Sequence, residues 1–247
     1  MSVGVIVVVC LIIFATHLAG AVAAYGSSLL ALPLLVLVIA DLDTAVYTLM
    51  IVGTVQVYHI VFYTYKDVVW REVRRVVIAA GVGLPFGYLL RERLPQAPLM
   101  VFLGAVLIAA GASSLLRRQM LNPKRPPEWA LNALLLAGGV IHGAFLTGGV
   151  CLVLYARFAF DRKETFRATL CMIWLIMNTG LVLVTICLGN FTAPVVRLSA
   201  IALPFLFAGN WLGQRVAVRI RQKRFLQFVC VMLVISGLVM IGRVLAS

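Results

Sequence analysis

Charged side chains are scarce in this sequence, and acidic ones are scarcer still. Only 12% of the 247 residues are charged, with 8 aspartates and glutamates against 21 lysines and arginines, while 63% are hydrophobic. A soluble domain is about a quarter charged, so this composition excludes an ordinary soluble protein. Long unbroken apolar runs, in place of short alternating segments, also exclude a transmembrane barrel. We therefore expect an all-α polytopic membrane protein.

No aspartate or glutamate lies inside an apolar run. The acidic residues all fall in loops or at segment edges: Asp41, Asp43, Asp67, Glu72, Glu92, Glu128, Asp161 and Glu164. Carriers coupled to protons or cations commonly keep a carboxylate deep in the membrane, so its absence favours an anionic substrate. An intramembrane enzyme would need a nucleophile–base pair or a metal cluster at depth. We accordingly expect a protein that is not an enzyme and has no cofactor and no metal.

Paired cysteines are missing as well. The five cysteines stand singly in apolar stretches: Cys10, Cys151, Cys171, Cys187 and Cys230. This pattern is typical of small buried apolar residues. Cys151 lies beside a glycine-rich break, where a sulfur-relay role is the alternative.

The net charge of +13 sits in short clusters between the apolar segments. This arrangement follows the positive-inside rule, which places the loops at 65–75 and 117–128 in the cytoplasm. The basic residues therefore indicate topology and contact with the lipid bilayer, with no nucleic-acid partner. Both termini are predicted to be periplasmic, and the N-terminal apolar run is interpreted as a retained membrane segment. Arg91 and Arg93 contradict the rule, because they fall in a loop expected outside.

Six apolar segments are long enough to cross a bilayer, which takes roughly 20 helical residues. They are 44–65, 75–91, 98–116, 168–189, 194–216 and 225–245. Two further pairs, 3–19 with 27–40 and 129–143 with 148–160, are shorter, and each pair is joined by a glycine-containing break. We expect these pairs to be re-entrant half-helices that meet near the middle of the membrane.

The two halves of the chain match each other. Gly83 and Gly87 correspond to Gly209 and Gly213 at a constant offset of 126 residues, and Gly26 corresponds to Gly148 at an offset of 122. Equivalent loops carry opposite charge character, so the sequence predicts two inverted-topology repeats, 1–122 and 123–247, that form one transport domain. Each repeat would hold a pair of half-helices plus three transmembrane helices. Inverted repeats with broken helices are typical of secondary transporters.

The stretches GAVAAYGSSLLALPLL (20–35) and GAFLTGGVCLVLY (143–155), with the paired GxxxG spans, resemble the sulfite exporter TauE/SafE family. The resemblance covers nearly the whole chain. It implies an exporter of small sulfur-containing or organic anions, such as sulfite, sulfoacetate or other sulfonates, across the bacterial inner membrane. It leaves the exact substrate, the coupling ion and the assembly open, a homo-oligomer included.

The breaks themselves are the candidate binding site. A half-helix N-terminus offers unpaired N–H groups and the positive end of the helix dipole, which together can hold an anion. Two such ends facing each other would form a cradle, with hydroxyl donors from the serines and the threonine. The cradle residues are Gly26, Ser27, Ser28, Thr147, Gly148 and Gly149. The alternative is that these small residues simply allow tight helix packing.

Buried polar side chains near the breaks extend the candidate site. Gln56 and Asn178 lie inside apolar spans, where they either line the pathway or bond between helices. His142 is a candidate for contact with the substrate or a proton, and His17 for the same role in the first repeat. The predicted mechanism is alternating access. A channel-like anion uniporter and a non-transporting membrane scaffold remain the alternatives.

Overall fold

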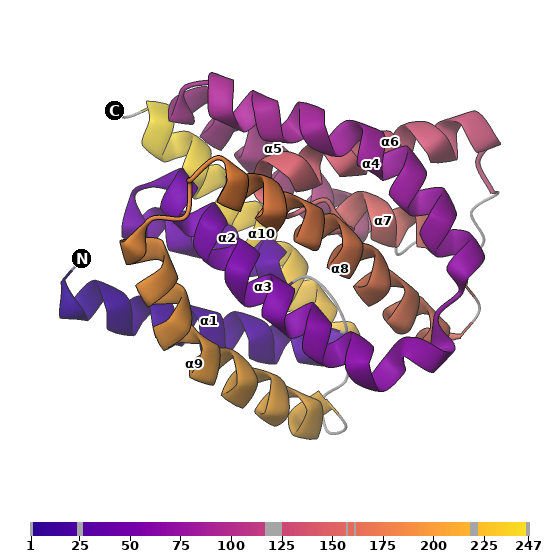
Figure 1. The fold of residues 1–247 in the computed structure, drawn as a ribbon, viewed down its shortest axis with the longest axis horizontal. Helices are drawn as coiled ribbons and strands as arrows, with labels where there is room; N and C mark the ends of the chain where they lie inside the picture. Colours follow the sequence, from indigo (N-terminus) through magenta and orange to yellow (C-terminus); the bar gives the residue numbers. More distant parts are fainter. Residues whose placement is uncertain are drawn as a thin grey trace. The chain divides into compact units, whose positions relative to one another are not determined.

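The fold was obtained as a computed structural model and is helical throughout the described residues (Figure 1). These are residues 2–23, 27–116, 125–156, 158–160, 162–217 and 222–245, and none of them forms a strand. The helices are α1 (Val3–Ala23), α2 (Ser27–Ile39), α3 (Leu42–Thr64), α4 (Trp70–Arg93), α5 (Gln96–Leu116), α6 (Glu128–Phe145), α7 (Gly149–Ala156), α8 (Lys163–Cys187), α9 (Ala193–Ala217) and α10 (Gln222–Leu245), with a short 3-10 turn, η1 (Tyr65–Asp67). The all-α prediction is confirmed.

Six helices are long and apolar enough to cross a membrane, counted over the described residues. They are α1, α3, α4, α6, α8 and α9. The set includes α1 and α6, which we expected to be half-helices. Only α2, with 13 residues, and α7, with 8, are clearly too short to span a bilayer. Re-entry of the paired segments therefore stays a prediction, and it now concerns α2 and α7 above all.

The chain divides into two compact units, each assembled from separate stretches of sequence. Unit 1 comprises Met1–Ala45, Arg93–Lys124 and Ile201–Ser247, and unit 2 comprises Val46–Glu92 and Arg125–Ala200. Unit 1 thus contains α1, α2, α5, α10 and most of α9. Unit 2 contains most of α3 together with α4, α6, α7 and α8.

Helices α5 and α10 of unit 1 pack closely at two glycine positions. A methyl group at Gly104 would lie 2.9 Å from the carbonyl oxygen of Gly237, and one at Gly111 would lie 2.6 Å from that of Cys230. Small residues let helix backbones approach to this distance. At the other end of α5, Gln96 donates to the Asp41 carboxylate (2.8 Å). Burial raises the pKa of Asp41, but hydrogen bonds from Thr44, Gln96 and the Asp43 backbone outweigh it and lower that pKa.

The two GxxxG sequences pack in the same way in separate units. In unit 1, Gly209 of α9 lies against the backbone of Phe14 in α1, and Figure 1 shows these two helices side by side. In unit 2, Gly83 of α4 lies against the backbone of Val140 in α6. Phe14 and Val140 are 126 residues apart, as are the two glycines. Matching positions in the two halves thus make matching contacts.

The end of α4 differs from the sequence-based expectation. Arg91 and Arg93 lie in the last turn of the helix, so their prediction as loop residues is wrong. Arg91 is only 3% exposed, although arginine is almost never fully buried without partners. The helix does not end where the apolar run ends. It continues through the charged residues Arg91, Glu92 and Arg93.

Candidate functional site

The break between α6 and α7 in unit 2 is a sharp turn of the backbone. Leu146 adopts the left-handed conformation (φ 57°), and its N–H donates to the carbonyl of His142 (2.8 Å). This bond closes the last turn of α6. After Thr147 the chain enters α7 at Gly149. The first N–H groups of α7 have no acceptor within their own helix, as at every helix start.

The break lies directly on the preceding helix. A methyl group at Gly148 would lie 2.6 Å from the Cβ of His142, and one at Gly138 would lie 2.9 Å from the Cβ of Cys151. A methyl group at Gly149 would lie 3.2 Å from the Trp174 ring of α8. Glycine is therefore required at 138 and 148 for α7 to fold back against α6. Packing and the start of α7 both depend on the same glycines.

Two polar groups of this break are buried without hydrogen-bond partners within the described part of the chain. They are the hydroxyl of Thr147, a residue 2% exposed, and the Nδ1 atom of His142. The other ring nitrogen, Nε2, lies 2.8 Å from the Oδ1 atom of Asn178. With this oxygen as acceptor, the neutral imidazole carries its proton on Nε2, and Nδ1 is an acceptor. Unpaired buried polar groups are rare and call for a physical explanation.

The corresponding region of unit 1 is only partly described. Ser27 and Ser28 are the first residues of α2 and are half-buried, whereas Gly26 lies outside the described residues. His17 of α1 is fully buried, and its Nδ1 atom lies 2.7 Å from the carbonyl oxygen of Ile13. The Nε2 atom of His17, like the Thr147 hydroxyl, has no partner among the residues described.

The predicted site residues thus fall into two groups. Thr147, Gly148, His142 and Asn178 come together in unit 2, while His17 and the two serines belong to unit 1. The hydrogen bond of Asn178 is interhelical, which was one of the two roles expected for it. Gln56, in α3 of unit 2, is half-buried and interacts with a neighbouring group.

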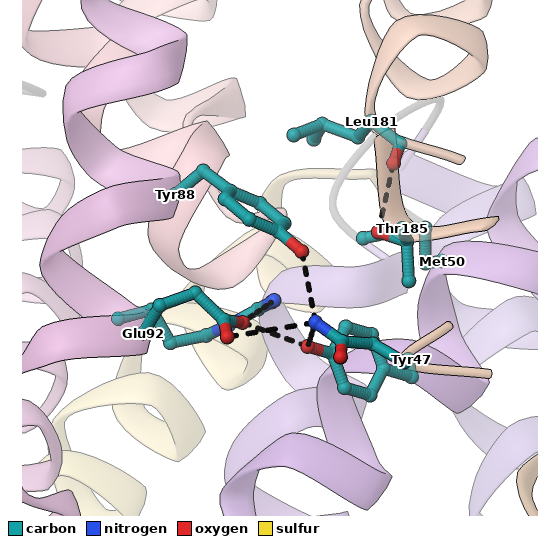
Figure 2. A network of polar contacts seen from close by, with 8 residues as sticks. Tyr47, Met50, Tyr88, Glu92, Leu181 and Thr185 are labelled. Atoms are coloured by element: carbon teal, nitrogen blue, oxygen red, sulfur yellow. Dashed lines mark hydrogen bonds and ion pairs between the residues drawn. The ribbon is translucent and has the colours of Figure 1, made fainter. Parts of the chain in front are cut away.

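Sequence analysis missed a second polar cluster in unit 2, at the ends of α3, α4 and α8 (Figure 2). Glu92 accepts a hydrogen bond from the Tyr47 hydroxyl (2.8 Å) and pairs with Arg91 (3.2 Å). Asn190 donates to the hydroxyls of Tyr47 (3.1 Å) and Tyr88 (3.2 Å). These hydrogen bonds connect the start of α3, the end of α4 and the residues after α8, which are far apart in the sequence.

The Arg91 guanidinium stacks between the two tyrosines of this cluster. Its Cζ atom lies 4.5 Å from the ring centroid of Tyr47 and 5.0 Å from that of Tyr88. Tyrosine rings stabilise a desolvated cation, and Glu92 balances its charge. The signal in the sequence was the violation of the positive-inside rule by Arg91, whereas Asn190, which bonds to the two tyrosines, gave no such signal.

No group of three or more histidine, cysteine, aspartate or glutamate side chains in the described ranges could hold a metal ion. The groups available at the α6–α7 break are instead neutral: the Thr147 hydroxyl and backbone N–H groups can donate, and the Nδ1 atom of His142 can accept. Such donors bind an anion without a buried countercharge.

Comparison with known proteins gave one match. No curated protein and no solved structure matches the chain significantly. The sequence model for "Sulfite exporter TauE/SafE" matches residues 9–240, nearly the whole chain. The protein therefore belongs to the sulfite exporter TauE/SafE family of membrane transporters.

Proposed function

We propose that the protein exports a small sulfur-containing or organic anion, such as sulfite, sulfoacetate or another sulfonate, across the bacterial inner membrane. The anion would bind at the N-terminal end of α7, at the Thr147–Gly148 break, in the middle of the bilayer. Alternating access would carry it from one side to the other.

The observation that carries this proposal is the buried Thr147 hydroxyl at the entry to α7, which has no partner among the described residues. An unpaired buried hydroxyl costs free energy unless a ligand bonds to it in another state. The next residue, Gly148, packs against the Cβ of His142, whose Nδ1 atom also has no partner among the described residues. A protonated anion, such as hydrogensulfite, would donate a hydrogen bond to Nδ1 of the neutral imidazole. If the imidazole were itself protonated, Nδ1 would carry a hydrogen and donate it to the anion.

The charge distribution supports an anionic substrate. Every acidic side chain of the described residues lies in a loop or in the first or last turn of a helix. The interior of the spans therefore contributes no carboxylate that would repel an anion. A membrane potential negative inside drives an anion outward by about 2.3 kcal/mol per charge per 100 mV, so export would need no coupling-ion site.

The paired contacts of the two GxxxG sequences support alternating access. In inverted-repeat carriers, two equivalent halves exchange conformations around a fixed site. The Gly83–Val140 and Gly209–Phe14 contacts correspond at one offset, as two repeats covering 1–122 and 123–247 require.

The test is counterflow of radiolabelled sulfite in proteoliposomes, using wild type and Thr147→Val. Valine keeps the shape of threonine and removes the hydroxyl. A hydrogen bond to a charged group contributes about 1.5 kcal/mol or more, so we expect transport at limiting substrate to fall about tenfold. Thermal stability should not fall, because the hydroxyl lost has no partner in the described structure.

Thr185→Val is the matched control. Its hydroxyl is also buried, but it donates to the Leu181 carbonyl within α8 (2.8 Å). This variant should transport normally. If the wild-type protein shows counterflow with neither sulfite nor any sulfonate tested, the proposed substrate class is wrong. Equal transport by the two variants would contradict the role of Thr147. Uptake without counterflow would identify a channel-like uniporter.

A further inference from the structure

A groove of about 760 Å³ runs between α4 and α6 of unit 2, and its lining includes no residue of the break described above. Its lining changes from polar to apolar along its length. Arg75, Glu128 and Asn132 line the polar part. Ile78, Val82 and Leu136 line the apolar part.

The glycines of α4 and α6 bring the two helix backbones together beside the apolar part of this groove. A methyl group at Gly83 would lie 2.9 Å from the Val140 backbone nitrogen, so the two helices are in backbone contact there. Toward the start of both helices, side chains replace this backbone contact. Arg75 bridges the space by pairing with Glu128 and donating to the Asn132 Oδ1 atom (3.2 Å). The groove is therefore polar at the starts of the two helices, which we call its mouth, and apolar beside the glycine contact.

The mouth of the groove carries a positive charge. Arg125 pairs with the second oxygen of Glu128 (2.9 Å). Arg71 precedes Arg75 by one helical turn on the same face of α4 and is exposed. Even with Glu72, which accepts a hydrogen bond from Tyr155, arginines outnumber carboxylates at this end of the two helices.

Two tryptophans indicate the depth of the mouth in the bilayer. Trp70 and Trp129 lie at the starts of α4 and α6, where they are 56% and 74% exposed. Exposed tryptophans of membrane proteins concentrate at the level of the lipid headgroups. The charged mouth therefore lies at headgroup level, and Ile78, Val82 and Leu136 lie at the level of the acyl chains.

We propose that this groove binds an anionic phospholipid of the leaflet in which α4 and α6 begin. The phosphate lies against Arg71, Arg75 and Arg125, and an acyl chain lies along Ile78 and Val82. Basic pockets between membrane helices favour acidic headgroups, and the arginines of the mouth match that charge. Under the positive-inside topology this is the cytoplasmic leaflet. The inference does not depend on the transported substrate.

The test is native mass spectrometry of the protein from mixed micelles with equal amounts of phosphatidylglycerol and phosphatidylcholine. The wild-type protein should retain more phosphatidylglycerol than phosphatidylcholine. Arg71→Gln with Arg125→Gln leaves the Arg75–Glu128 pair intact and should weaken the preference about fivefold for each cation removed. Arg162→Gln with Arg197→Gln removes the same charge from exposed positions elsewhere and should leave the preference unchanged.

The apolar part is tested separately with Ile78→Trp, which fills the groove. Retention of both lipids at this site should fall, whereas Leu183→Trp, at an exposed position of α8, should retain lipid as wild type does. Equal retention of the two lipids by wild type would overturn the proposal. So would unchanged retention in the groove variants, or a dimer that Ile78→Trp dissociates, since a second copy would then occupy the groove.

Discussion

At the scale of single residues, the strongest departures from simple membrane chemistry are buried polar atoms. The Arg91 guanidinium lies over two tyrosine rings, and its charge is balanced by Glu92. Thr147 and His142 instead keep atoms that no described residue contacts by hydrogen bond. The first arrangement is typical of a structural contact, and the second is consistent with the binding site proposed above, because buried polar atoms are usually hydrogen-bonded.

We predict that Arg91→Gln lowers stability through loss of this contact. Cation–π contacts with desolvated cations contribute up to about 2 kcal/mol, and Gln cannot replace the charge opposite Glu92. Thermal unfolding in detergent should show a lower midpoint for Arg91→Gln. The control Arg93→Gln changes an exposed arginine two residues away and should change stability by less than about 0.5 kcal/mol. Equal midpoints for the two variants would contradict the structural role of Arg91.

At the scale of helices, three pairs of helix backbones approach each other closely at glycines. α4 packs on α6, α9 on α1, and α5 on α10, each at glycines whose added methyl group would meet a backbone atom. The GxxxG spacing of α4 and α9 gives each helix a face of small residues. It did not name their partners, because a glycine pattern shows which face is small and not which helix covers it.

We predict that Gly83→Ala destabilises unit 2, because the added methyl group would overlap the α6 backbone. Overpacking of this kind costs about 1–3 kcal/mol. Gly81→Ala, on the same helix, meets no atom within 4 Å and should be neutral or stabilising, since alanine favours helix over glycine. Unfolding midpoints of both variants, measured in one detergent, check the difference. A Gly83→Ala variant as stable as Gly81→Ala would show that the contact is not close.

At the scale of the whole molecule, the distribution of charge determines the expected orientation. The cationic ends of α4 and α6 should lie in the cytoplasm, and the uncharged α8–α9 connection should lie outside. Arg91, the main exception, is buried in a neutralised cluster, so it does not weigh on topology as an exposed loop arginine would.

We predict this orientation to appear in cysteine labelling. The five native cysteines would be replaced, and single cysteines placed at the exposed positions Thr192 and Asp67. Thr192→Cys should react with a membrane-impermeant maleimide in intact cells, because it lies in the outer connection. Asp67→Cys should react only after permeabilisation. The reverse pattern would mean the opposite orientation and would move the proposed lipid site to the outer leaflet.

The sequence alone determined the membrane class, the all-helical fold, the family and nearly all helix positions, because each depends on hydropathy, length and local glycine motifs. Only the tertiary structure decided that Asn178 pairs with His142, that the Thr147 hydroxyl has no partner among the described residues, and that Asn190 joins Tyr47 and Tyr88. These contacts join residues 36 to 143 positions apart in the chain. Pairings at such separations depend on how the helices pack, which hydrophobic patterns along one chain do not encode.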